Sequence, residues 1–305
     1  MGPTLVEVYN KVLTGDKLGE AMTQGVISLM FEKGDKANVR NYRPISLVNV
    51  DYKILAKTMA LRLDKILPRL VEGDQRAFVQ GRSIFLNILT AIESVEVILS
   101  ENRDMTVLLL DLEKAYDRVG WSFVLTTLRK MGFGDNFCRW VIAMFTSASW
   151  TVQVNGHLSS PFQLSRSLRQ GCLLAPLLFM LQLEIPLNCI RKHPAIRGIP
   201  LGEGRECRAK ALADDLFLVS ENTQGSLVAI KDVLQDYSML FKAQVNWDKS
   251  SYMLPEDFAL AVEWGMHRVD SAEGERFLRV YISLQLMSLV QGLILQHRVT
   301  AKLRI

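Results

Sequence analysis

Residues 105–111 read Met-Thr-Val-Leu-Leu-Leu-Asp, a short apolar run that ends in an acidic side chain. Such a run predicts a strand that is buried on both faces, with Asp111 at its C-terminal end. A second acidic stretch, Ala213-Asp-Asp215, lies between two strand-like segments around 208–212 and 216–219. If these segments form a hairpin beside the first strand, Asp111, Asp214 and Asp215 meet at one end of a sheet.

Carboxylates that meet in this way repel one another, and a divalent cation is the usual resolution. Oxygen ligands without accompanying His or Cys favour magnesium, with manganese as a second option, over zinc. Asp-Asp is also a common turn dipeptide, because Asp tolerates turn conformations and bonds its own backbone. The pair alone leaves a solvated turn open, and the flanking apolar segments favour the metal site.

The remaining patterns predict an α+β fold, most economically an antiparallel sheet backed by helices. Asn155-Gly156 between strand-like segments, 150–154 and the residues up to 164, is a strong hairpin signal. A further strand is expected near 251–254. Apolar residues three and four apart predict helices over 51–67 (ending at Pro68), 83–99, 121–131, 135–146, 175–191 and 225–241.

The 305 residues are 49% hydrophobic and 22% charged, which is ordinary for a globular protein with a sizeable core. A net charge of +4 permits a nucleic-acid partner without arguing for one. The segment 191–210 is richer in basic residues, and this is typical of either a solvated loop or a phosphate-facing surface.

Four scattered cysteines form no C-x-x-C pair, so we expect no zinc site, no disulfide framework and a reducing compartment. The N-terminus lacks the pattern of a secretory leader. The longest apolar stretch, 172–181, is shorter than the about 20 residues that span a bilayer. We therefore expect a soluble, intracellular protein that does not enter a membrane.

Five segments stand out in chain order: Asn41-Tyr-Arg-Pro-Ile-Ser-Leu47, Gln80-Gly-Arg82, Leu110-Asp-Leu-Glu-Lys-Ala-Tyr-Asp-Arg-Val119, Arg169-Gln-Gly-Cys172 and Ala213-Asp-Asp215. As a set, and in this order, they resemble the motifs of reverse transcriptases of the LINE type, the polymerases of non-LTR retrotransposons. The resemblance runs from about residue 2 to residue 281.

The resemblance implies an RNA-directed DNA polymerase, which adds deoxynucleotides to the 3′-hydroxyl of a DNA primer along an RNA template. Asp111 and Asp214 would hold two magnesium ions, with Asp215 assisting. The two ions would clamp the attacking and leaving oxygens of an in-line displacement.

Other residues match family positions around the incoming deoxynucleoside triphosphate and the primer. These are Tyr116 (beneath the sugar, excluding a 2′-hydroxyl), Gln170 and Gly171 (at the nucleotide), Arg40 and Arg43 (at the triphosphate), Lys249 (at the leaving pyrophosphate), and Phe277 and Leu278 (the primer grip). Taken without the family, Tyr116 is equally a core aromatic, Gly171 a turn before a helix, and Arg40 and Lys249 solvated cations.

The implied architecture is that of a right-hand polymerase, with an antiparallel palm sheet backed by helices. The fingers would take residues 1–104 and about 119–168, and the palm 105–118 and about 169–282. Residues 283–305 would be the truncated start of a thumb or a divergent tail. A ribonucleoprotein in nucleus and cytoplasm is implied by the family alone.

Five positions depart from the family pattern: Ser167 and Arg279 where glycine is common, Leu173 where proline is usual, Ala175 where serine is usual, and Leu212 where an aromatic residue is usual. These changes spare the acids but alter their surroundings. A catalytically inactive nucleic-acid-binding remnant is therefore the alternative function. A group II intron maturase and a metal-dependent phosphatase fit less well, since the second gives no reason for the segment 169–172.

Overall fold

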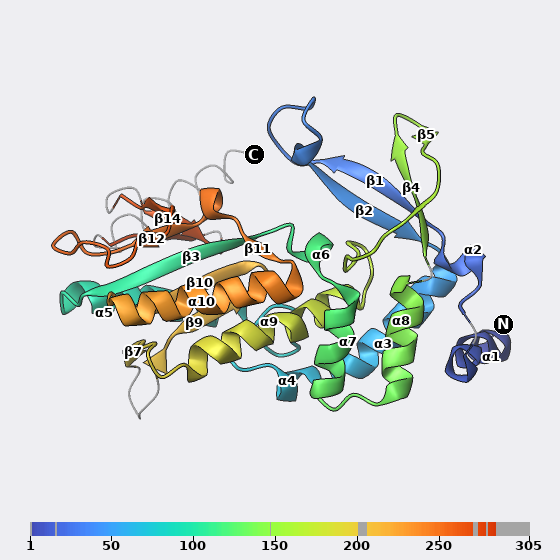
Figure 1. The fold of residues 1–305 in the computed structure, drawn as a ribbon, viewed down its shortest axis with the longest axis horizontal. Helices are drawn as coiled ribbons and strands as arrows, with labels where there is room; N and C mark the ends of the chain where they lie inside the picture. Colours follow the sequence, from blue (N-terminus) through green and yellow to red (C-terminus); the bar gives the residue numbers. More distant parts are fainter. Residues whose placement is uncertain are drawn as a thin grey trace, which may run out of the picture.

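The computed structural model describes residues 2–15, 17–146, 148–200, 206–270, 274–278 and 280–284. A six-stranded sheet lies at the centre of one half of the fold, in the order β13-β12-β3-β10-β9, with β11 also paired to β3 (Figure 1). All of its pairings are antiparallel except that of β12 with β13. The strands are β3 (Met105–Glu113), β9 (Ala209–Leu212), β10 (Asp215–Glu221), β11 (Gln244–Val245), β12 (Ser251–Met253) and β13 (His267–Arg268).

The central strand β3 is buried on both faces because helices cover the sheet from both sides. Val107 and Leu109 belong to one hydrophobic cluster, and Leu108 and Leu110 belong to the other. Successive side chains of a strand point to opposite faces, so an unbroken apolar run is what this position requires. The expectation of a doubly buried strand is confirmed.

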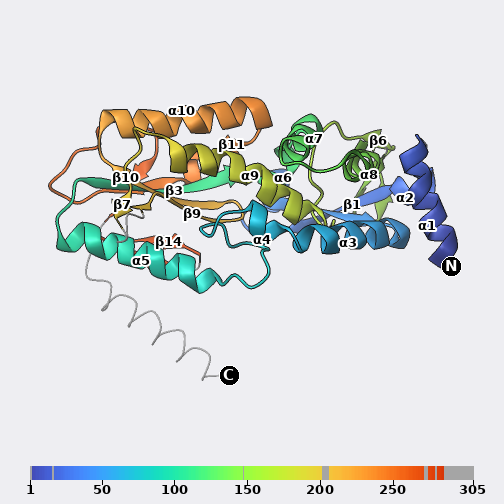
Figure 2. The ribbon, with the colours of Figure 1, turned by 90° about the horizontal axis from the view of Figure 1, so that it is seen from below.

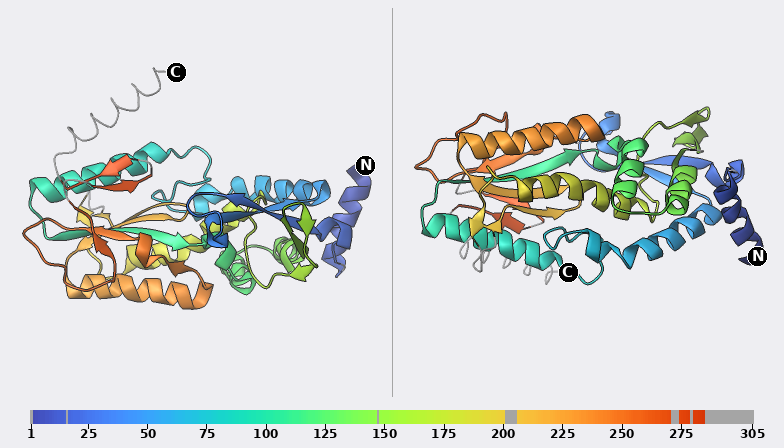
Figure 3. Two further views of the ribbon diagram at one scale, coloured as in Figure 1. Left: turned by 90° about the horizontal axis from the view of Figure 1, so that it is seen from above. Right: turned by 60° about the horizontal axis from the view of Figure 1, so that its bottom comes forward.

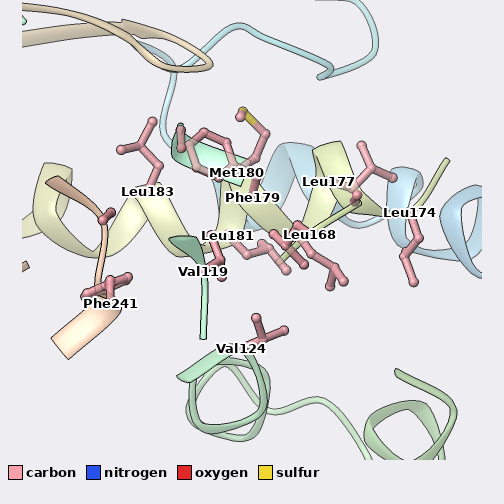
Figure 4. Packing of buried hydrophobic residues seen from close by; sticks show 14 of the residues in the cluster. Val119, Val124, Leu168, Leu174, Leu177, Phe179, Met180, Leu181, Leu183 and Phe241 are labelled. Carbon is pink, nitrogen blue, oxygen red and sulfur yellow. The ribbon is translucent and has the colours of Figure 1, made fainter. Parts of the chain in front are cut away.

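One face of the sheet packs against α5 (Ile84–Ser100), and the other against α9 (Ala175–Lys192) and α10 (Gln224–Phe241). Figure 2 shows the sheet between α5 on one side and α9 and α10 on the other, and the left view of Figure 3 shows the same layers from above. The α9 helix is the centre of the larger cluster. Figure 4 shows Phe179, Leu181 and Leu183 of this helix in the cluster that also contains Val119, Leu168 and Phe241.

A second, five-stranded sheet stands at the other half of the molecule (Figure 1). Its strands are β1 (Gly25–Phe31), β2 (Tyr42–Val48), β4 (Ser149–Val154), β5 (His157–Leu158) and β6 (Phe162–Gln163). The β1–β2 hairpin was not predicted, and β1 pairs in parallel with β4, which is distant in sequence. A Cβ on Gly25 would lie 2.3 Å from the Trp150 ring, so this pairing needs glycine there.

The other elements surround these two sheets. The helices and 3-10 helices are α1 (Gly2–Lys11), η1 (Val12–Thr14), α2 (Glu20–Thr23), η2 (Val39–Asn41), α3 (Val50–Asp64), α4 (Leu67–Leu70), α6 (Ala115–Arg118), α7 (Trp121–Lys130), α8 (Asp135–Thr146) and η3 (Trp247–Lys249). The short strands β7 (Ile199–Pro200), β8 (Glu206–Cys207), β14 (Glu275–Phe277) and β15 (Val280–Ile282) form two hairpins. In the described ranges, no helix has the length and apolarity needed to cross a bilayer.

The predicted helices are present with bounds that differ by a few residues. One difference is that the first of them ends at Asp64, and Pro68 then occupies the first turn of the separate helix α4, where its missing N–H costs nothing. The Asn155-Gly156 hairpin is also present, and both residues have positive φ, of 51° and 83°. This is the turn geometry that the dipeptide favours.

The basic segment 191–210 is largely folded into the structure where it is described. Arg191 lies between Asp74 and Glu184 in an ion-paired cluster. Arg208 pairs with Glu206 and donates to the backbone carbonyls of residues 191 and 193. These two guanidiniums are therefore internal braces and not a phosphate-facing surface.

The loop 71–83 closes the free edge of the central sheet. Gln75 bridges to Ala211 of β9; the Arg76 amide donates to the Ala211 carbonyl, and the Ala211 amide donates to the Asp74 carbonyl. The fully buried Asn87 side chain also donates to the Ala211 carbonyl, at 2.9 Å. The Arg82 guanidinium of the loop donates to four backbone carbonyls, those of residues 71, 72 and 75 in the loop and that of residue 68 in the preceding helix α4. The loop therefore behaves as a fixed part of the sheet.

Ser167 carries backbone strain at a position where the family resemblance expects glycine. Its φ is +113°, a region that residues with a Cβ rarely adopt. The strain persists because the surroundings determine this backbone: the Ser167 amide donates to the Val119 carbonyl, and the Ser167 carbonyl accepts from the Trp121 indole, both at 2.9 Å. The Ser167 hydroxyl gains only a 3.4 Å hydrogen bond to Asp117.

Replacing Ser167 with glycine should therefore stabilise the protein by about 1 kcal/mol, because glycine relieves the strain and loses only one long hydrogen bond. The urea midpoint of unfolding should rise with an unchanged slope. Ser238→Gly, inside α10, is the matched control and should lower the midpoint. A drop in the midpoint for Ser167→Gly would show that the backbone at 167 is not strained.

Candidate active site

Two of the three predicted acidic residues face each other across neighbouring strands. Asp215 on β10 is the direct partner of Asp111 on β3 in the antiparallel register. Asp214 follows Ala213 in the two-residue turn between β9 and β10, and Ala213 takes a φ of +56° in this turn. The expected hairpin beside the first strand is confirmed, and it brings the three acids to one end of the sheet.

The strand that carries Asp111 is longer than predicted. β3 continues past Asp111 to Glu113, so Asp111 lies inside the strand and does not end it. The extension exists because β11 pairs with Leu112 and Glu113 and satisfies their backbone groups. The Asp111 amide donates a hydrogen bond to the Ser250 hydroxyl at 3.2 Å, and the Asp111 carbonyl accepts one from the Asn246 amide at 2.8 Å. The backbone of Asp111 is therefore held on both sides.

The carboxyl groups influence one another electrostatically. Loss of surrounding water, followed by the charges of Asp214 and Asp111, raises the pKa of the Asp215 carboxyl to about 6. Partial burial also raises the pKa of the Asp111 carboxyl, whereas Lys249 acts against this rise. Acidic groups that favour a proton in this way are groups that a cation would stabilise in their charged form.

The donor set suits a hard cation, because it consists of carboxylates without His or Cys. In the part of the chain that the structure describes, no three His, Cys, Asp or Glu side chains form a ready-made metal cluster. Asp111, Asp214 and Asp215 are thus neighbours whose side chains would have to turn together around an ion.

A cavity of about 680 Å³ opens in front of Asp111 and Asp214, between the two sheets. Most of the residues singled out from the sequence line this one cavity: Arg40, Arg43, Asp111, Tyr116, Gln170, Gly171, Asp214 and Lys249. They come from segments that lie far apart in the chain. The fold therefore brings together residues that the sequence presents only as separate motifs.

The cationic wall of the cavity is formed by Arg43 on β2 and Lys249 at the end of η3. Arg43 pairs with Glu32 at 2.5 Å, and this bond, with a further contribution from Asp214, raises the pKa of the Arg43 guanidinium. Lys249 acts electrostatically on both Glu32 and Asp111. Arg40 is exposed and lies in η2 near the same wall. The arrangement places positive charge opposite the acids.

The aromatic floor of the cavity is Tyr116, which lies in α6 directly after β3. Its ring stacks on Phe179 of α9 with ring centroids 4.8 Å apart and planes 22° apart. Burial raises the pKa of the Tyr116 hydroxyl. Tyr116 is only half-buried, so it joins the core with one face and still borders the cavity.

The Gln170-Gly171 turn forms another side of the cavity and contacts the edge strand β2. The Gln170 carbonyl accepts from the Ser46 amide at 2.8 Å. Gly171 has a φ of +108°, and a Cβ there would lie 2.6 Å from the Ser46 carbonyl oxygen. Only glycine allows this approach.

The remaining predicted residues lie outside the main cavity. Asp215 and Phe277 line a smaller neighbouring cavity of about 190 Å³, which Asp111 and Lys249 also border. Phe277 is buried and packs against Phe217, with ring centroids 5.4 Å apart. Leu278 is also buried, has a φ of +51° and borders neither cavity. Arg279 lies outside the described residues.

Sequence reasoning missed Glu32, Asn246 and Ser250 as parts of the site. Glu32 follows a strand that the sequence pattern did not reveal, and nothing in its local sequence signals a pairing with Arg43. Asn246 and Ser250 act on Asp111 through hydrogen bonds that form only when β11 and β12 pair with β3. Of the departures, Leu212 is half-buried against the core, and Leu173 is exposed.

Comparison with known proteins agrees with this geometry. Residues 32–281 match the family model described as reverse transcriptase (RNA-dependent DNA polymerase). The chain is 32% identical, over 93% of its length, to the transposon TX1 uncharacterized 149 kDa protein of Xenopus laevis. It is 25% identical, over 64% of its length, to a retrovirus-related Pol polyprotein from the type-1 retrotransposable element R2 of Popillia japonica. It spans only 22% and 27% of these two relatives.

Among solved structures, the telomerase from Candida tropicalis in complex with a TWJ fragment of telomeric RNA has a similar fold, with a TM-score of 0.59. The match covers 92% of this chain and 47% of that one, at 13% identity. This likeness supports the right-hand polymerase architecture. Together with the family model, the retrotransposon relatives show that the chain belongs to the reverse transcriptase (RNA-dependent DNA polymerase) family, as a domain of the LINE type.

Proposed function

We propose that the chain carries out RNA-directed DNA synthesis, adding deoxynucleotides to a DNA primer along an RNA template. The single observation that supports this most is the shared cavity, in which Asp111, Asp214, Tyr116, Gln170 and Arg43 converge. Acids, cations, an aromatic ring and an open glycine backbone are the groups that a nucleoside triphosphate and its transfer require.

Asp111 and Asp214 are the proposed ligands of two magnesium ions, with Asp215 assisting from the neighbouring strand position. Carboxylate oxygens and the raised pKa values of Asp111 and Asp215 support a cation at this end of the sheet. When bound, magnesium would activate the primer 3′-hydroxyl and neutralise charge on the pyrophosphate.

The protein's own side chains would bind and orient the nucleotide. Arg43, with Arg40 nearby, would bind the triphosphate, since a guanidinium can contact two phosphate oxygens at once. Lys249 would donate a proton to the leaving pyrophosphate. Tyr116 would lie under the sugar, and the Gly171 backbone would allow the nucleotide to come close.

The decisive experiment is primer extension on a poly(A) RNA template with an oligo(dT) primer, dTTP and magnesium. Asp214→Asn should lower the rate more than about 100-fold, because it removes charge that holds the metal at the reacting oxygens, a contribution of several kcal/mol. Asp236→Asn, an exposed acid on α10, is the matched control and should extend the primer normally.

Equal extension by wild type and Asp214→Asn would contradict the assignment of the metal ligands. Absence of extension by both, from proteins with native circular dichroism, would refute the polymerase proposal and leave the nucleic-acid-binding remnant as the better account.

The raised pKa of Asp215 predicts how pH affects stability without metal. An acid whose pKa is about 6 in the folded protein and 3.8 ordinarily gives the folded state extra protons between these values, so stability falls as pH rises through about 6. Asp215→Asn should therefore raise the melting temperature at pH 7.5 in EDTA, and the gain should shrink as the pH falls toward 4.5. A gain that is independent of pH would contradict the assigned pKa.

The proposed position of Tyr116 under the sugar, with its ring held by stacking on Phe179, predicts a role in sugar selection. Tyr116→Ala should raise the efficiency of UTP relative to dTTP by about tenfold or more, since a gap of this size removes the clash with a 2′-hydroxyl. Tyr116→Phe keeps the ring and should keep the selectivity. The ratio of kcat/KM for the two nucleotides measures this, and an unchanged ratio in Tyr116→Ala would exclude Tyr116 from this role.

A further inference from the structure

Arg169 is a buried cation that the proposed chemistry does not use. Its residue is only 2% exposed, and among the described residues no carboxylate forms an ion pair with it. Instead, its guanidinium lies over three aromatic rings, those of Tyr52, Phe145 and Trp150, at 5.3, 5.1 and 4.6 Å from their centroids. A charge buried without an acid is costly, so stability alone is a poor reason for an arginine here.

The guanidinium has two hydrogen bonds with fixed directions. One nitrogen donates to the Tyr52 hydroxyl and another to the Phe145 carbonyl, both at 2.8 Å, while Nε has no partner. Tyr52 belongs to α3, Phe145 to α8 and Trp150 to β4, so the cage joins three separate elements. A planar fork held in this way fixes the position of its own backbone, which an apolar side chain of equal size would not do.

The backbone that this fork fixes leads directly into the candidate active site. The Leu168 amide donates to the Tyr116 carbonyl at 2.7 Å, and the Cys172 amide donates to the Arg169 carbonyl at 3.1 Å. Between them, the Gln170 carbonyl accepts a hydrogen bond from the Ser46 amide, on the outer edge of β2. Arg169 thus anchors this turn through directed side-chain hydrogen bonds, in addition to these backbone bonds, the burial of Leu168 and Cys172 in the core and the 3.8 Å contact of the Cys172 thiol with the Tyr52 hydroxyl.

We propose that Arg169 is a positioning residue for the nucleotide site: its caged guanidinium holds the Gln170-Gly171 turn against β2, so that the turn is already in place when a deoxynucleotide binds. The nucleotide part of this inference rests on the proposed function. The placement of the turn does not, because it follows from the contacts of Arg169 and Ser46 alone.

The test compares Arg169→Met, which keeps an unbranched side chain of similar volume but removes the fork, with Val95→Ala on α5, in the separate hydrophobic cluster. Two quantities are measured on the full chain: hydrogen exchange of peptides covering 42–48 and 168–173, and binding of a fluorescent dATP analogue with magnesium. Thermal unfolding provides the reference for stability.

Arg169→Met should lose no more stability than Val95→Ala, since an apolar side chain of similar volume avoids burying a charge. Its exchange in 42–48 and 168–173 should nevertheless rise at least tenfold, and its affinity for the analogue should fall at least fivefold. Val95→Ala should change neither. If Arg169→Met fails to fold, Tyr52→Phe, which deletes only the hydroxyl, should raise exchange in the same two peptides.

If hydrogen exchange at 168–173 is the same in Arg169→Met as in Val95→Ala, the proposal is overturned and Arg169 is an ordinary core residue. If wild type does not bind the analogue, the proposed polymerase function fails, yet the exchange data still decide whether Arg169 positions the turn. The two failures are therefore distinguishable.

Discussion

The pairing of β3 with β10 is the constraint on which the rest of the molecule depends. Both strands are apolar on both faces, so neither can form unless helices cover the sheet from two sides. A one-residue slip would move every side chain to the opposite face, and two differently shaped clusters would then be filled wrongly. The register that satisfies both clusters is also the one that sets Asp215 beside Asp111. Core packing therefore determines the spacing of the acids.

The parts of the fold that could be predicted are those with a local signal. These signals are the apolar run of β3, the Asn155-Gly156 dipeptide of the hairpin and the helical periodicity of α8 and α10. Each is contained in one continuous segment of the sequence, and each element was predicted. The β1–β2 hairpin was missed because its connection, 32–41, is long and charged and lacks a short turn signal. Its sheet partner β4 lies far along the chain, and pairing at that distance leaves no periodicity to detect.

The candidate site shows the same division. Asp111, Asp214, Tyr116, Gln170 and Lys249 were indicated because their residue types follow a family pattern, and the fold brings them to one cavity. Contacts made by backbone atoms, such as Ser46 with Gln170, have no side-chain signature and could not be predicted. The departures from the family pattern also differ in their structural cost. Leu173 is exposed, whereas Ser167 has a φ that suits glycine.

The contacts that loop 71–83 and Asn87 of α5 make with β9 have a consequence for the order of events during synthesis. Asn87 and its partner Ala211 are 124 positions apart, so the ribosome needs roughly 6–25 s to produce the second after the first at typical rates of about 5–20 residues per second. During that interval the apolar face of α5, with Val95 and Ile98, has no sheet to cover. For those seconds the apolar side chains of this segment lack the sheet that covers them in the folded protein.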